Sequence, residues 1–157
     1  MPYSPAIVAN AVLYRAKQHG LYVSHLKLQK LMFFTHAWRL ALHNRAAVEE
    51  RPEAWEYGPI FSTLYHRLKG SGHEQLRDYI ATVQPQTNAY AELMPSPGDA
   101  GFWRILDQVV DRYGPLNALQ LCTMSHQPGG AWDQARKLKQ ATIPDETIRS
   151  CFREMLK

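Results

Sequence analysis

Glu53-Ala54-Trp55-Glu56-Tyr57-Gly58-Pro59-Ile60 is the stretch of this sequence that decides the fold. Its aromatic residues, Trp55 and Tyr57, alternate with Glu56 as side chains do on an extended segment. Gly58 can adopt backbone angles that other residues avoid. Pro59 suits the first position of a helix, where a backbone N–H would have no partner. The stretch therefore predicts an extended segment that turns sharply and starts a helix at Pro59.

Two other segments carry distinctive combinations of residues. The first is Leu28-Gln29-Lys30-Leu31-Met32-Phe33-Phe34, followed by His36-Ala37-Trp38 and Leu40-Ala41. The second is Met124-Ser125-His126-Gln127-Pro128-Gly129-Gly130-Ala131-Trp132-Asp133-Gln134-Ala135. In chain order, the three segments resemble the signatures of the Panacea domain family. These signatures read L-x-K-L-L/M-Y/F-F with a following A-W-x-L, then A-W-x-Y-G-P-V/I, then T/S-H-x-x-G-G-x-W-x-x-A.

The Panacea domain family includes the SocA-like antitoxins and the phage-associated GepA proteins. The resemblance covers about residues 5 to 155, because Ile143-Pro144-Asp145-Glu146-Thr147-Ile148 is also similar to the start of the family's closing helix. One position departs from the pattern: the family often has Pro before the late Trp, where this chain has Ala131.

The resemblance implies an antitoxin-like protein that neutralises a cognate toxin, encoded by an adjacent gene, through direct protein contact. For SocA-like members it implies an adaptor role, in which the bound toxin is delivered to an ATP-dependent protease. For other members it implies simple occlusion. The residues that we assign to partner contact are Glu56, Tyr57, His126 and Trp132. Those that we assign to the scaffold of the motifs are Lys30, Trp38, Trp55, Gly58 and Pro59.

The composition is ordinary for a soluble globular chain, with 45% hydrophobic and 20% charged residues among 157. We therefore expect residues 1–157 to form a single domain. The net charge is +4 and the positive residues are scattered, whereas a strong nucleic-acid binder usually shows a clustered basic stripe. The small cluster of Arg136, Lys137 and Lys139 is interpreted as a solvated helix end. No direct DNA binding is expected.

Targeting and redox features favour a cytoplasmic location. The first residues lack the succession of basic, apolar and small residues that marks a signal peptide. The longest apolar run, at 31–42, contains His36 and Arg39 and is shorter than the roughly 20 residues that a membrane span needs. No membrane association is therefore expected. Cys122 and Cys151 lie far apart and not in a metal-ligand spacing, so we expect free thiols in a reducing compartment.

Hydrophobic periodicity predicts a mainly α fold, a compact bundle of about six to eight helices. Helices are expected at 5–19, 25–43, 59–69, 100–113 and 115–125, with a short one after Gly130 and a last one from Pro144. The helix at 25–43, capped by Ser24, is apolar over so much of its circumference that it should be the central one. Residues 84–101 are rich in Pro, Gly and Asn and predict a long loop. The family resemblance implies a short two-stranded ribbon at 47–57.

Metal and cofactor signatures are weak in this sequence. Its seven histidines include no His-Glu-x-x-His pair. His36 and His43, seven residues apart, are interpreted as core or solvated residues rather than as ligands. The sequence contains no phosphate-cradling glycine loop and no dinucleotide fingerprint, so no cofactor is expected.

Ser125-His126 invites a hydrolase interpretation. The nucleophile elbow Gly-x-Ser-x-Gly is absent, and adjacent Ser and His side chains point in different directions on most backbones. Cys122 could meet His126 on a helix, but it lies in an apolar run. A small hydrolase that uses His126 with Ser125 or Cys122 is therefore the less favoured alternative. A mobile-element accessory protein that binds a host factor is the other alternative.

Overall fold

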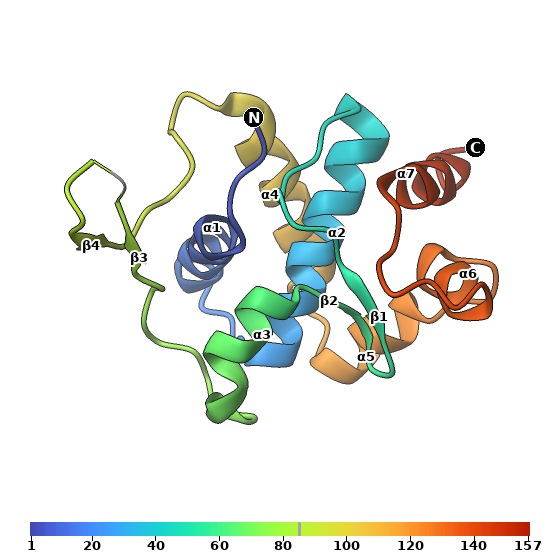
Figure 1. Ribbon diagram of the computed structural model, residues 1–157, viewed down its shortest axis with the longest axis horizontal. Coiled ribbons are helices and arrows are strands. Elements are labelled where there is room, and N and C mark those ends of the chain that lie inside the picture. The colour runs from blue at the N-terminus through green and yellow to red at the C-terminus, as the bar shows by residue number, and fades with distance from the viewer. Residues whose placement is uncertain (85) are drawn as a thin grey trace.

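The structure is a computed structural model that describes residues 1–84 and 86–157. In these residues one of seven α-helices lies at the centre of the others, and two small ribbons lie outside it (Figure 1). The helices are α1 (Pro5–Gln18), α2 (His25–His43), α3 (Ser62–Leu68), α4 (Ala100–Tyr113), α5 (Ala118–Ser125), α6 (Ala131–Lys137) and α7 (Asp145–Glu154), with a 3-10 turn at Lys69–Ser71. The antiparallel ribbons are β1 (Glu53–Trp55) with β2 (Gly58–Ile60), and β3 (Thr82–Val83) with β4 (Tyr90–Ala91). The predicted mainly α fold is confirmed.

Helix α2 is the centre of the core, as its sequence predicted. It is buried on nearly every side, because α1, α4, α5 and α7 all pack against it. Ser24 caps its start by accepting a hydrogen bond from the backbone N–H of Lys27 at 3.4 Å. Asn44 ends it in the left-handed conformation, with φ 55°. Since α2 is surrounded, its polar side chains Gln29 and Lys30 must find partners inside the protein.

The starts of α4 and α5 are set by capping side chains. α4 begins after Asp99, whose carboxylate accepts a hydrogen bond from the first turn, where the sequence predicted it. α5 begins at Ala118 and not at Pro115, so the predicted start was wrong. The reason is a capping box, in which the side chains of Asn117 and Gln120 each accept a hydrogen bond from the other's backbone N–H at 2.9 Å.

The stretch at 53–60 folds as a tight hairpin and not as a strand followed by a helix. Gly58, at φ 104°, closes the turn, and Ala54 lies opposite Pro59 in the register. The helix predicted from Pro59 begins only at Ser62. Pro59 is tolerated in the strand because Ala54 turns its N–H outward to the carbonyl of Ala141 at 3.0 Å, so this pair has no ladder hydrogen bond to lose.

Both ribbons differ from the sequence prediction in position. The ribbon implied at 47–57 lies at 53–60 instead. The second ribbon, β3–β4, was not predicted, and β4 falls in the stretch expected to be a loop at 84–101. Within that stretch, Pro85 lies outside the described residues.

Candidate functional site

Two polar side chains of α2 occupy the outer edge of β2. Gln29 accepts a hydrogen bond from the backbone N–H of Phe61 at 2.9 Å and donates one to its carbonyl at 3.2 Å. Lys30 Nζ donates to the carbonyl of Pro59 at 3.0 Å. On the other side of the hairpin, the backbone of residues 141–143 forms hydrogen bonds along the outer edge of β1, as a neighbouring strand would. The backbone at both edges of the hairpin is therefore engaged, and the hairpin is fixed to the core.

Lys30 is a lysine with no exposed surface. Burial lowers the pKa of its ammonium group from the ordinary value of 10.5 to about 8. No carboxylate lies within salt-bridge distance of it in the part of the chain that the structure describes. A buried amine without a counter-ion costs stability in its charged form. Lys30 thus links α2 to the hairpin at an energetic cost that an apolar residue would avoid.

Gly58 is the point at which the hairpin meets this buried polar cluster. A Cβ on Gly58 would lie 2.8 Å from Ser125 Oγ, 2.9 Å from Lys30 Nζ and 3.2 Å from His126 Nε2. Side chains from α2 and from the end of α5 therefore converge on the bare face of Gly58. Glycine is required both by these contacts and by a φ of 104°, which L-residues rarely adopt.

His126 and Trp132 lie behind the hairpin as a stacked pair. Their ring centroids are 4.0 Å apart at an interplanar angle of 11°, and Trp132 Nε1 donates to the carbonyl of Trp55 at 2.7 Å. Burial lowers the pKa of His126, and the nearby charge of Lys30 lowers it further, whereas a backbone hydrogen bond at Tyr57 opposes the shift. His126 Nε2 is buried and has no hydrogen-bond partner among the described residues. A neutral imidazole thus supports the hairpin from inside.

The predicted site residues, with one exception, lie at or directly behind the hairpin. The exception is Trp38, which is buried between α2 and α4 and donates to a tyrosine hydroxyl at 2.9 Å. Glu56 and Tyr57 form the exposed tip, where Tyr57 is 64% exposed. His126 and Trp132 are half-buried. The geometry therefore divides the four predicted contact residues into an exposed tip and an internal support.

Ser125, His126 and Cys122 do not form a nucleophile–base pair. The Ser125 hydroxyl donates to the carbonyl of Cys122 at 2.8 Å, and His126 Nε2 is left without a partner in the described part of the chain. Burial raises the pKa of the Cys122 thiol, although the charge of Lys30 opposes this. The arrangement of these residues therefore gives no geometric support to the hydrolase alternative.

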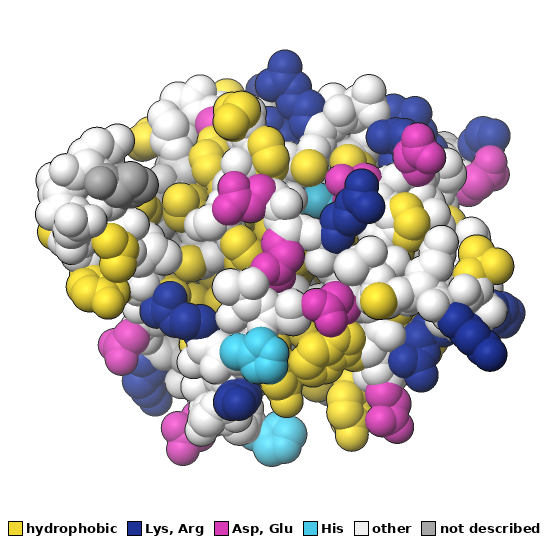
Figure 2. Space-filling model, in the orientation of Figure 1, with side chains coloured by type: hydrophobic (Ala, Val, Ile, Leu, Met, Phe, Trp, Pro, Cys, Tyr) yellow, Lys and Arg dark blue, Asp and Glu magenta, His cyan; other side chains and the backbone are white. Residues whose placement is uncertain are grey.

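An open groove lies between the hairpin, the start of α2 and α3, and we call it the hairpin groove. Its cavity volume is about 580 Å³. Figure 2 shows hydrophobic side chains gathered between α3 and the β1–β2 hairpin, next to a histidine. The aromatic wall of the hairpin groove is built from Trp55 and Tyr65, whose ring centroids lie 4.7 Å apart in an edge-on arrangement. Leu26 adds an aliphatic surface. Tyr57 lines the groove at the tip.

Basic side chains border the hairpin groove. Arg136 of α6 donates to the carbonyl of Ala54 at 3.1 Å, and its guanidinium lies 5.6 Å from the ring centroid of Trp132. Arg136 and Lys69 are both exposed. Arg136 was not among the predicted site residues, because its basic cluster resembled a solvated helix end. Its position four residues after Trp132 was the available signal, since that spacing places both on one face of α6.

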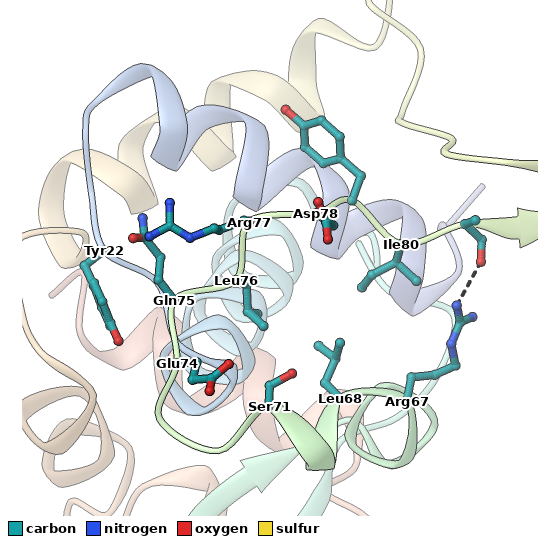
Figure 3. Close-up of a pocket in the computed structure, with 12 residues that line it drawn as sticks. Tyr22, Arg67, Leu68, Ser71, Glu74, Gln75, Leu76, Arg77, Asp78 and Ile80 are labelled. Carbon is teal, nitrogen blue, oxygen red and sulfur yellow. Dashed lines mark hydrogen bonds between the residues drawn. The ribbon is translucent and has the colours of Figure 1, made fainter.

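A second hollow, larger and more polar, lies beyond the 3-10 turn and has a cavity volume of about 670 Å³. In Figure 3, Arg67 lies along one side of this hollow and donates to the carbonyl of Ala81 at 3.0 Å, while Leu68, Leu76 and Ile80 point toward the middle of the hollow. Its charged lining residues are Arg67, Glu74, Arg77 and Asp78. Since none of the predicted site residues lines this hollow, the hairpin groove is the better candidate site.

Neither a metal centre nor a membrane-spanning helix is found in the residues that the structure describes. They contain no group of three or more His, Cys, Asp or Glu side chains placed to hold a metal ion. None of their helices combines the length and the apolar character that crossing a bilayer requires.

The motifs at the hairpin are those of a known protein family. The family model described as "Antitoxin SocA-like, Panacea domain" matches residues 28–133, which is more than half of the chain, and the chain therefore belongs to this family. The predicted resemblance is confirmed.

A particular relative is Antitoxin SocA of Caulobacter vibrioides (strain NA1000 / CB15N), which is 29% identical to this chain over 126 residues. The alignment covers 80% of this chain and 66% of that protein, just under two thirds of its length. No solved structure matches this chain.

Proposed function

We propose that this chain is an antitoxin-like protein that neutralises a cognate toxin, encoded by an adjacent gene, through direct protein contact. The main support is the exposed hairpin tip, where Glu56 and Tyr57 project beside an open groove. A tyrosine that is 64% exposed on a fixed turn is a typical interface anchor. The similarity to Antitoxin SocA supports the same conclusion.

The attachment of the hairpin to the core also favours binding. Gln29 and Lys30 hold β2 from one side, while Trp132 and Arg136 donate to β1 carbonyls from the other. A surface that is already ordered loses little conformational freedom when a partner binds. The tip is therefore suited to tight, stoichiometric contact in the cytoplasm, the location expected from the sequence.

Co-expression with the product of the neighbouring gene tests the proposal, with growth rescue and co-purification as readouts. Wild type is expected to restore growth and to co-purify with the neighbour. Tyr57→Ser is expected to weaken both effects, whereas Tyr90→Ser is the matched control, because Tyr90 is 76% exposed on β4 and does not line the groove. A toxic neighbour that is neither bound nor neutralised would remove the antitoxin function. A harmless neighbour would favour the accessory protein that binds a host factor.

Delivery to an ATP-dependent protease is the second step of the proposal. It predicts that the toxin's lifetime after translation arrest shortens when this chain is present, and only in cells that contain the protease. A toxin that is inactive but equally long-lived in both strains would establish occlusion instead.

A further inference from the structure

We propose that the hairpin groove binds an extended segment of the partner in which an apolar side chain is followed by a carboxylate. This inference deepens the proposed function, on which it rests for the identity of the partner as a toxin. It concerns the chemistry of the segment, and the residues that select it are Trp55, Tyr65, Arg136 and Lys69.

The apolar side chain is selected by the wall of the groove. Trp55 and Tyr65 present ring surfaces 4.7 Å apart between centroids, and His25 packs against Tyr65 at 5.4 Å. Burial lowers the pKa of His25, and the charge of Lys30 lowers it further, so this surface carries no charge at neutral pH. A cavity of about 580 Å³ falls within the range of roughly 300–1,000 Å³ typical of ligand sites, so it accommodates more than one side chain.

The carboxylate is selected by Arg136. One of its N–H groups is used by the carbonyl of Ala54 at 3.1 Å, which fixes the guanidinium beside the groove and leaves donors available. Among the described residues, Glu56 at the tip is the one acidic side chain that lines the groove, and no carboxylate lies within salt-bridge distance of Arg136 or of Lys69. A guanidinium held in this way favours a bidentate contact with a carboxylate. The net charge of +4 adds a long-range attraction for an acidic partner segment.

Strand addition is not the binding mode that the hairpin supports. Residues 141–143 engage the outer edge of β1, and Gln29 and Lys30 engage that of β2. A partner segment therefore has few backbone groups to pair with here, and recognition depends on its side chains.

The test is a titration of the full chain, followed by ¹H–¹⁵N NMR, with two blocked dipeptides, acetyl-Phe-Glu-amide and acetyl-Phe-Gln-amide. We expect shifts at the Trp55 indole N–H and at the backbone of Leu26 and Arg136. The Glu peptide should bind about tenfold more tightly than the Gln peptide, as for one charge-assisted contact. Arg136→Gln should remove that preference, and Arg136→Lys should retain part of it. Arg77→Gln, in the second hollow, is the matched control and should leave it unchanged.

Equal affinities for the two peptides, or shifts confined to residues 67–81, would overturn the inference. A preference that persists in Arg136→Gln would do the same. These outcomes are independent of co-expression with the neighbouring gene. If the toxin binds but the peptides are not distinguished, the inference fails and the proposed function stands. If the peptides are distinguished but the neighbour is neither bound nor neutralised, the groove chemistry stands and the antitoxin function fails.

Discussion

Lys30 and Pro59, 29 residues apart in the sequence, are joined by a hydrogen bond of 3.0 Å from a buried ammonium group to a strand carbonyl. This contact connects two of the matched motifs, since one residue belongs to α2 and the other to β2. It places a titratable group in the core directly behind the exposed tip. The stability of the hairpin is therefore coupled to the protonation of Lys30.

Lys30→Met should change how stability depends on pH. Below about pH 8, Lys30 is protonated in both the folded and the unfolded state, so burial of its charge lowers the free energy of unfolding in full. Above the ordinary pKa of 10.5 it is neutral in both states, and the cost vanishes. Between these values the unfolded state binds more protons than the folded state. Raising the pH from 7.5 to 9.5 therefore relieves the cost of Lys30 and increases the free energy of unfolding by about 2 kcal/mol.

Urea unfolding at these two pH values measures this contribution. Lys30→Met should lack the rise, and Lys137→Met, a change at an exposed lysine, should keep it. At pH 7.5 the methionine variant should lie within about 2 kcal/mol of wild type, because relief of the buried charge offsets the unpaired Pro59 carbonyl. An identical pH dependence in wild type and Lys30→Met would contradict the assignment.

Gly58→Ala should be strongly destabilising, by about 2–4 kcal/mol, from backbone strain together with overpacking. The new methyl group would lie within 3.2 Å of three polar side-chain atoms at a φ of 104°. Gly20→Ala is the matched control, because Gly20 has φ 66° but no other atom lies within 4 Å of the position that a Cβ would take there. It should cost only about 1–2 kcal/mol, the penalty of the left-handed conformation. Equal losses in thermal or urea unfolding would show that the polar cluster exerts no steric constraint.

His126→Phe should separate the two roles of this side chain. The phenyl ring keeps the stack on Trp132, removes the buried Nε2 that lacks a partner among the described residues, and loses the backbone hydrogen bond at Tyr57, so the two polar effects on stability oppose each other. We therefore expect a change in the free energy of unfolding of less than about 1 kcal/mol, whereas His126→Ala should lose about 1–3 kcal/mol with the stack. Urea unfolding provides both values. A large loss in His126→Phe would mean that the imidazole makes a polar contact essential to the fold.

The helices were the part of the fold that sequence patterns could predict. The apolar circumference of residues 25–43 identified the central helix, and Asp99 marked the start of α4, because both signals are local. The helix start predicted at Pro59 was wrong, because Pro59 is tolerated in β2 through a contact with Ala141, which is distant in sequence. Similarly, Asn10 exchanges hydrogen bonds of 2.7 and 2.9 Å with the backbone of Ile80, a contact that no local pattern reveals.

The candidate site could be predicted only in part. The motif residues at the hairpin were identified by family resemblance, and most of them do gather there. Trp38 belongs to the same motif as Lys30 but faces α4. Two residues that are eight positions apart on a helix can face different neighbouring elements, here α4 for Trp38 and β2 for Lys30. Arg136 was missed since its role depends on the carbonyl of Ala54. That residues 1–157 form one domain, and that the tip contacts a partner, remain predictions.

Hydrogen exchange of the chain, alone and in complex with the neighbouring gene product, tests the central claim most directly. Our account predicts new protection at residues 53–60 and 131–137, with little change at residues 74–83. Protection confined to residues 74–83, or a stable complex that leaves the hairpin exchange unchanged, would contradict it.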